Sequence, residues 1–437
     1  MRDYLVIAFV LACLPVGLYS PYFGLLFYSW ISYFYPQWLA WSFARTFPIA
    51  YAAGLSLLAG FILNRLPGEL SLLRRRENAV QIALLAMFTL SSYFSLYPAM
   101  AWDKWEGMVK VILIAMLTSV LITDRARLRT FLLVVALSLG FYGFKGGLFG
   151  LSNSGQNIVW GPGSSIIGAN NAIGLALNMC LPMLWYLSKG EKRKWLKLGL
   201  RLTFLLSIPA IMFTYSRGST LALGIILLLL ILKSRKRFLV LPLAVALGIA
   251  AFPYLPQRWL TRQQSTVNYE DDESAVARLM EWKFCWRVAT DRPLTGGGFS
   301  LYTNATYRKY YPEFLEVYGK RFSSHSIYFG ILAEHGFIAL ALFLMMMAFS
   351  FHSLLVISRR VRGQPQLQWL KNYSDMIQLS LIAFLINGAF VDMQYFDLVY
   401  QLPAVVASMR FLTRKALEGE AVESAGFVPE VRPALVS

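Results

Sequence analysis

The chain has 437 residues, of which 57% are hydrophobic and only 15% are charged. Soluble domains carry roughly 25% charged residues, and the mean hydropathy here is +0.52. Apolar runs recur along the chain, and about 20 such residues suffice for a helix to cross a bilayer. The composition therefore excludes an ordinary soluble enzyme and predicts an all-α polytopic membrane protein.

The formal net charge of +18 does not indicate a nucleic-acid partner, because the basic residues lie in short segments between the apolar runs. Such basic loops face the cytoplasm in membrane proteins. They fall at residues 65–76, 125–129, 189–197, 233–237 and 359–371, and Arg414 and Lys415 follow the last run. We expect all of them on the cytoplasmic side.

Taken in order, the apolar runs predict about twelve transmembrane helices with both termini in the cytoplasm. Residues 4–19 form the first, which we expect to be an uncleaved span rather than a signal peptide. Residues 21–35 are short and bracketed by prolines, which is typical of a re-entrant, interfacial or broken segment. The other spans are expected at about 47–64, 78–97, 107–122, 129–148, 169–187, 197–214, 217–233, 238–253, 327–351, 374–392 and 396–413.

This plan divides the chain into four parts. Residues 1–252 hold the N-terminal transmembrane helices and residues 326–413 the C-terminal ones. Residues 253–325 form one large periplasmic loop. Residues 414–437 form a cytoplasmic tail, which we expect to be disordered from Glu418 onward because it is polar and contains prolines.

The periplasmic side also receives residues 97–106, the Gly-, Ser- and Asn-rich loop 150–170 and the tight turn 214–219. Within the long loop, residues 274–289 read as an amphipathic helix. Its apolar positions recur at three and four residues: Leu279, Trp282, Cys285, Trp286 and Ala289. Two tryptophans on this face suit the membrane–water interface.

Two arginines on the predicted periplasmic side run against the positive-inside bias. Arg217 lies in a turn where Ser216 is a helix N-cap residue type, so free amides and a guanidinium meet in a candidate anion site. The alternative is an arginine solvated by lipid head groups. Arg278 lies in the amphipathic helix, where it either binds an anion, pairs with Glu281 or extends to the interface.

His325 is surrounded by serines at the start of the span 327–351. A helix N-terminus disfavours the imidazolium form, so the ring can accept a proton; the alternative is a polar capping residue. His335 lies deeper in the same span, and His352 is interpreted as structural. The three cysteines and these histidines show no metal-ligand spacing, so we expect no metal and no cofactor.

The two arginines and the histidine together fit a lipid-linked diphosphate. Guanidinium groups bind such a head group by bidentate hydrogen bonds, and a histidine can deprotonate an attacking hydroxyl while the diphosphate leaves. Lys145, near the end of its span, and Asn171, beside Asn170, are weaker candidates for the same cavity. Their alternative is a role as helix-end residues.

At these residues the chain resembles the O-antigen ligase and O-antigen polymerase superfamily of bacterial envelope glycosyltransferases. The resemblance covers the twelve-span plan with one large periplasmic loop near the end. Its motifs are Ser216-Arg217-Gly218, Arg278 with Trp282, Pro293, Gly296 and Gly298, and His325-Ser326 followed by Gly336. The start Met1-Arg2-Asp3-Tyr4 and the length look most like the O-glycosylation ligases associated with exosortase systems.

The resemblance implies a metal-independent, inverting glycosyltransferase of the membrane C-type class in the bacterial inner membrane, with its active site facing the periplasm. The donor would be a glycan on undecaprenyl diphosphate, and the acceptor the lipid A core or a protein. Arg217 and Arg278 would hold the diphosphate, and His325 would activate the acceptor hydroxyl.

Two other functions stay open from the sequence. A polymerase would extend the glycan on its lipid carrier, and the short motifs do not separate it from a ligase. A transporter of amphiphilic lipids is less favoured, because transporters place ionisable groups at mid-membrane. Here the spans are nearly free of charge, and Asp392 and Asp397 lie near the outer ends of the last two.

Overall fold

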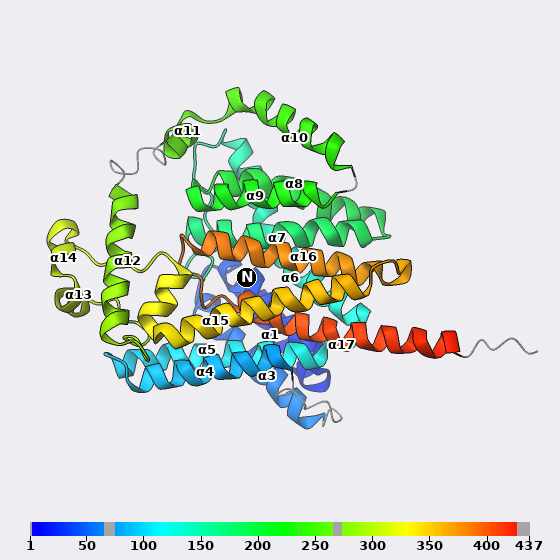
Figure 1. Cartoon of the computed structure of the whole chain (residues 1–437), viewed down its shortest axis with the longest axis horizontal. Helices are drawn as coiled ribbons and strands as arrows, with labels where there is room; N and C mark the ends of the chain where they lie inside the picture. Colours follow the sequence, from blue (N-terminus) through cyan, green and yellow to red (C-terminus); the bar gives the residue numbers. More distant parts are fainter. Residues whose placement is uncertain (1, 65–74, 235, 265–272, 426–437) are drawn as a thin grey trace, which may run out of the picture.

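A computed structural model of the chain describes residues 2–64, 75–234, 236–264 and 273–425. All regular elements in these ranges are helices, and none of the described residues forms a strand. Most of the long helices run side by side in a bundle, and a group of shorter helices covers one of its ends (Figure 1). The prediction of an all-α protein is therefore confirmed.

Every apolar run predicted from the sequence forms a helix, including the short run 21–35. These are α1 (Arg2–Tyr19), α2 (Pro21–Phe34), α3 (Ile49–Leu63), α4 (Arg76–Tyr93), α5 (Pro98–Leu121), α6 (Arg125–Ser152), α7 (Asn170–Gly190), α8 (Lys194–Met212), α9 (Arg217–Leu232), α10 (Arg237–Ala251), α15 (Ile327–Arg360), α16 (Gln368–Gly388) and α17 (Asp397–Ala425). Hydrophobic length alone thus located the helices of the bundle.

Five helical stretches in the described ranges are long and apolar enough to cross a membrane: Arg2–Tyr19, Arg125–Ser152, Lys194–Met212, Arg237–Tyr254 and Ile327–Arg360. Helices α3 and α9 are apolar but shorter. Large apolar side chains are exposed along α10, where Phe238 and Leu239 are 82% and 68% exposed, as expected for a surface that meets lipid. The chain is a multi-pass membrane protein, and the number of twelve crossings stays a prediction.

Two predicted boundaries differ from the structure. Residues 98–106, expected outside the spans, are the first turns of α5, which begins with Pro98 at a position that favours proline. Residues 418–425, expected to be disordered, continue α17 to Ala425, because this stretch is rich in alanine and glutamate, which favour helix. Residues 426–437, the rest of the predicted tail, lie outside the described residues.

The predicted loop 253–325 contains a small folded cap. Its elements are η4 (Phe252–Tyr254), α11 (Gln257–Gln264), α12 (Glu273–Asp291), α13 (Asn304–Tyr310) and α14 (Pro312–Tyr318). The rings of Phe284 in α12 and Tyr307 in α13 stack with centroids 3.9 Å apart, inside an apolar cluster that also contains Phe314 of α14. The loop therefore has a core of its own, and α12 packs it onto α15 (Figure 1).

The predicted amphipathic helix 274–289 is confirmed as part of α12, but its buried face differs in part from the predicted one. Cys285 and Ala289 are buried as expected. Leu279 and Trp286 are 45% and 51% exposed, whereas the polar Glu281 is buried. Burying a polar residue on the inner face of this helix costs free energy unless the group is hydrogen-bonded or paired.

Helix α15 is broken at Gly336, whose φ of 80° and ψ of −177° are not helical. The glycine-rich segment 293–298 docks at this break through backbone hydrogen bonds. The Gly297 amide donates to the Ala333 carbonyl oxygen and the Gly298 amide to the Glu334 carbonyl oxygen, both over 2.8 Å. The Phe337 amide donates to the Pro293 carbonyl oxygen over 2.9 Å. The cap is thus joined to the bundle by main-chain groups that the break leaves available.

We expect Gly336→Ala to destabilise the protein. A Cβ at this position would lie 2.5 Å from the Pro293 carbonyl oxygen, and a positive φ costs a non-glycine residue about 1–3 kcal/mol. The melting temperature of the purified protein in detergent should fall. Gly224→Ala in α9 is the control, because a Cβ there meets nothing within 4 Å. Equal melting temperatures for the two variants would show that the break in α15 does not require glycine at position 336.

Candidate functional site

The candidate site lies where α12, the turn before α15 and the segment between α16 and α17 meet. His325 takes a left-handed backbone conformation with φ of 45°, just before α15 begins at Ile327. Its Nδ1 atom lies 3.5 Å from Oδ2 of Asp392, and both side chains are only partly exposed, at 31% and 24%. The two residues form a histidine–carboxylate pair.

Neighbouring serines hold the Asp392 carboxylate in place. The hydroxyls of Ser323 and Ser324 donate hydrogen bonds to its two oxygens, one each. From the sequence, these serines indicate only the surroundings of a helix start. In the structure they fix the Asp392 carboxylate beside the imidazole. A carboxylate in this position can orient a histidine ring, as it does in serine hydrolases.

Trp282 attaches the histidine turn to α12. Its indole Nε1 donates to the carbonyl oxygen of Ser324 over 3.1 Å, and its ring stacks on Phe329 with centroids 5.0 Å apart. The indole therefore fixes the backbone next to His325 relative to the helix that carries Arg278. A tryptophan expected to face the interface has a positioning role instead.

Burial lowers the pKa of His325, the Asp392 carboxylate opposes this shift, and the Arg278 guanidinium adds to it. The lowered pKa keeps the ring neutral at pH 7, so that it can accept a proton. Burial raises the pKa of Glu281 to about 8, with Asp392 raising it further and Arg278 opposing. Arg278 and Asp392 thus influence the pKa of both His325 and Glu281, which is consistent with the predicted grouping of Arg278 with His325.

Glu281 is 1% exposed, and its Oε2 atom makes no hydrogen bond within the described part of the chain. With a pKa of about 8, this carboxyl is largely protonated at neutral pH. The Arg278 guanidinium opposes this shift, so the two side chains interact, and the sequence alternative of an Arg278–Glu281 pair stays open.

Arg217 is the first residue of α9, and the hydroxyl of Ser216 accepts a hydrogen bond from the Ser219 amide over 3.3 Å. The predicted N-cap is thus confirmed. A Cβ on Gly218 would come within 2.9 Å of Phe390, which lies two residues before Asp392. The start of α9 therefore packs against the segment that carries Asp392, and a common pocket of Arg217 with His325 stays a prediction.

The weaker candidates occupy other surroundings. Lys145 lines a cavity of about 490 Å³ together with Arg45, Trp38 and Trp160, and the lining includes none of His325, Arg217 and Arg278. Asn171 accepts a hydrogen bond from the Ala172 amide over 2.9 Å at the start of α7. Neither the lining of this cavity nor this hydrogen bond involves His325, and a place for either residue in the site stays a prediction.

His335 belongs to a buried network rather than to the site. It has no exposed surface. Its Nδ1 lies 2.6 Å from the Ser91 hydroxyl, and its Nε2 lies 2.7 Å from the hydroxyl of Tyr395, which donates to Glu334. Tyr395 lies three residues after Asp392. The network therefore anchors the segment that carries Asp392 to α15.

Asp392 is a partner of His325 that the sequence did not predict. The sequence indicates this residue only as a charge near the end of a span. One signal could have found it: an acidic residue between two apolar helices that immediately follow the histidine helix. None of the described residues forms a group of three or more His, Cys, Asp or Glu side chains that could hold a metal ion.

Comparison with protein families gives two matches. Residues 202–344 match the family described as O-antigen ligase, and this range contains Arg217, Arg278 and His325. Residues 1–189 match a family of unknown function (DUF5935). No curated protein matches the chain.

Asp392→Asn is expected to lower the His325 pKa further, because it removes the negative charge that favours the imidazolium form. The measurement is the pH dependence of carbethoxylation of His325, which requires the neutral ring and is read by peptide mass spectrometry. Asp291→Asn, an exposed carboxylate of the same loop that pairs with Lys309, should leave the midpoint unchanged. An upward shift in Asp392→Asn, or the same shift in both variants, would show that the pair does not exist in solution.

Proposed function

Because its residues 202–344 place this chain in the O-antigen ligase superfamily, we propose that it is a glycan ligase. It transfers a glycan from undecaprenyl diphosphate to a hydroxyl group of an acceptor, which is the lipid A core or a protein. The reaction is an inverting, metal-independent glycosyl transfer in the bacterial inner membrane, at the periplasmic face. The observation that carries the proposal is the partly buried His325–Asp392 pair, with Arg278 and Glu281 of α12 influencing the same groups.

His325 acts as the general base in this proposal. The acceptor oxygen forms a bond with the anomeric carbon of the glycan while the bond from that carbon to the diphosphate oxygen breaks, and the hydroxyl proton moves to the imidazole. The lowered pKa of His325 supports a ring that is neutral before the step. Asp392, 3.5 Å from Nδ1, stabilises the imidazolium that forms.

The arginines receive the charge of the leaving diphosphate. Each charge-assisted hydrogen bond from a guanidinium to a phosphate oxygen contributes about 1.5–3 kcal/mol. Arg278 is supported by its position beside the histidine and by the protonated neighbour Glu281. Arg217 is supported by its place at the first turn of α9, where free backbone amides also attract an anion.

The membrane side follows from the distribution of basic residues. The end of the bundle opposite the cap carries Arg75, Arg76, Arg360 and Arg414, which the positive-inside rule assigns to the cytoplasm. The cap and His325 then face the periplasm, where lipid-linked glycans are attached. A second product class, a longer glycan on the lipid carrier, is what a polymerase of the same superfamily would make.

His325→Ala should reduce glycan transfer by about 10²–10⁴-fold, the usual contribution of a general base. The assay measures transfer from a synthetic undecaprenyl-diphosphate sugar to acceptor by the purified protein. Arg308→Ala, an exposed residue of the cap, is the matched control. Transfer at the control rate would reject the base, and elongated lipid-linked chains without acceptor product would identify a polymerase.

Arg278→Ala should weaken donor binding by about 10-fold or more, which corresponds to the loss of one charge-assisted hydrogen bond. Arg278→Lys should restore it poorly, because an ammonium group lacks the planar, bidentate geometry. Binding of a non-transferable donor analogue is the measurement, again with Arg308→Ala beside it. Full rescue by lysine would mean that Arg278 supplies only charge, and unchanged affinity in Arg278→Ala would remove it from the site.

A further inference from the structure

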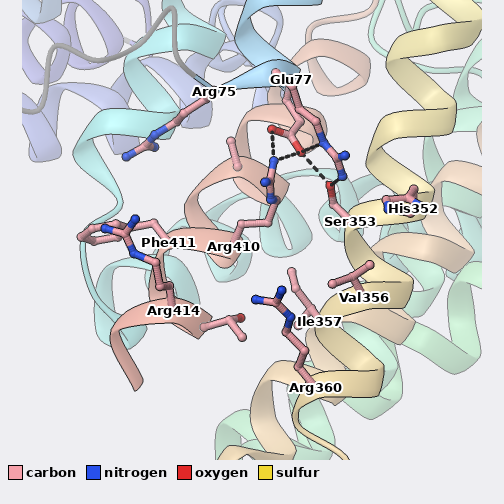
Figure 2. Close-up of a pocket in the computed structure, with 13 residues that line it drawn as sticks. Arg75, Glu77, His352, Ser353, Val356, Ile357, Arg360, Arg410, Phe411 and Arg414 are labelled. Atoms are coloured by element: carbon pink, nitrogen blue, oxygen red, sulfur yellow. Dashed lines mark hydrogen bonds and ion pairs between the residues drawn. The ribbon is translucent and has the colours of Figure 1, made fainter. Parts of the chain in front are cut away.

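A second polar cavity lies at the other end of the bundle. It has a volume of about 700 Å³ and is lined by residues of α4, α15 and α17. Five arginines contribute to its wall, namely Arg75, Arg76, Arg360, Arg410 and Arg414, and Glu77 is the only carboxylate among the described lining residues. Figure 2 labels four of these arginines, Arg75, Arg360, Arg410 and Arg414, with the Glu77 carboxylate beside Arg410.

The cavity is distinct from the histidine site. Helix α15 begins two residues after His325, and beyond its break at Gly336 it continues to Arg360; these last 24 residues, at about 1.5 Å per residue, span roughly 36 Å. That is more than the roughly 30 Å of a bilayer core. The arginine cavity therefore lies on the opposite membrane side, and a ligand bound there does not reach His325.

Glu77 organises one wall of the cavity. It has no exposed surface, and each of its oxygens lies 3.1 Å from Nη1 of Arg410. Ser353 donates to Glu77 over 2.7 Å and accepts from Nη2 of Arg76 over 2.6 Å. A buried carboxylate that fixes two guanidiniums leaves them preorganised, so that little side-chain entropy is lost when an anion binds.

One carboxylate cannot neutralise five arginines, so the described lining carries a formal excess of four positive charges. Arg414 pairs with Glu418, but the two side chains are 70% and 67% exposed, where such pairs are weak. The Arg360 side chain, at the last position of α15, is exposed. Figure 2 shows its guanidinium directed from α15 toward the side chains of α17.

We propose that this cavity is a binding site for a phosphate-bearing anion. Several guanidiniums around one space match the oxygens of a phosphate group, and basic pockets between helices at the cytoplasmic end of membrane proteins bind anionic lipid head groups. The phosphate comes either from an anionic phospholipid or from a soluble phosphate compound. Binding ties α4, α15 and α17 together at this end and does not depend on the proposed transfer reaction.

The test uses the full chain, purified in a neutral detergent. Native mass spectrometry and thermal shift measure binding of cardiolipin, phosphatidylglycerol, phosphatidylcholine and inorganic pyrophosphate. The double variant Arg360→Gln, Arg414→Gln leaves the Glu77 contacts intact and should weaken binding of the anionic probes by at least about tenfold. The matched control is Arg359→Gln, Arg362→Gln, which removes two exposed arginines of the same end outside the cavity.

Binding of both anionic lipids without pyrophosphate identifies a lipid head group, and binding of pyrophosphate identifies a soluble phosphate. If the double variant Arg360→Gln, Arg414→Gln does not fold, Arg360→Lys replaces it. This change keeps the positive charge but loses the planar, bidentate guanidinium, so it should weaken binding of the anionic probes severalfold. No binding of any anionic probe, or an equal loss in the control pair, would overturn the proposal. Since His325 lies at the other end, glycan transfer measured in parallel separates this outcome from a failure of the proposed function.

Discussion

The geometry of the site depends on the docking of residues 293–298 onto the break in α15. Backbone hydrogen bonds join Gly297 and Gly298 to Ala333 and Glu334, and Gly336 permits the break through its positive φ. This contact sets α12, which ends at Asp291, against the start of α15. Arg278 and His325 are therefore positioned by main-chain contacts at residues that carry no chemistry themselves.

The cluster around His325 shows how burial selects protonation states. Arg278, Glu281, His325 and Asp392 share a partly desolvated space, where unpaired charges are costly. Burial lowers the pKa of His325 and raises that of Glu281 to about 8. The lowered pKa leaves His325 neutral at pH 7, which is the state that the proposed transfer to a hydroxyl acceptor needs before the reaction.

Arginine serves different purposes at the two ends of the bundle. Near the cap, Arg278 lies beside Glu281, whose pKa burial raises to about 8. At the far end, Arg410 is held by the buried Glu77 through both carboxylate oxygens. Arg278 thus lies beside a carboxyl that is difficult to ionise, whereas the Arg410 guanidinium is fixed in one orientation in the wall of the arginine cavity.

The sequence by itself determined the helices, because apolar length, the N-cap at Ser216 and the period of residues 274–289 are local properties of the chain. It also selected Arg278 and His325 as candidates. Only the tertiary structure brought Asp392 to His325, across 67 positions of the chain, and placed α4, α15 and α17 around the arginine cavity. Local patterns state which residues form a helix and which face is polar. They do not state which helices become neighbours, because that choice depends on packing between segments far apart in the sequence.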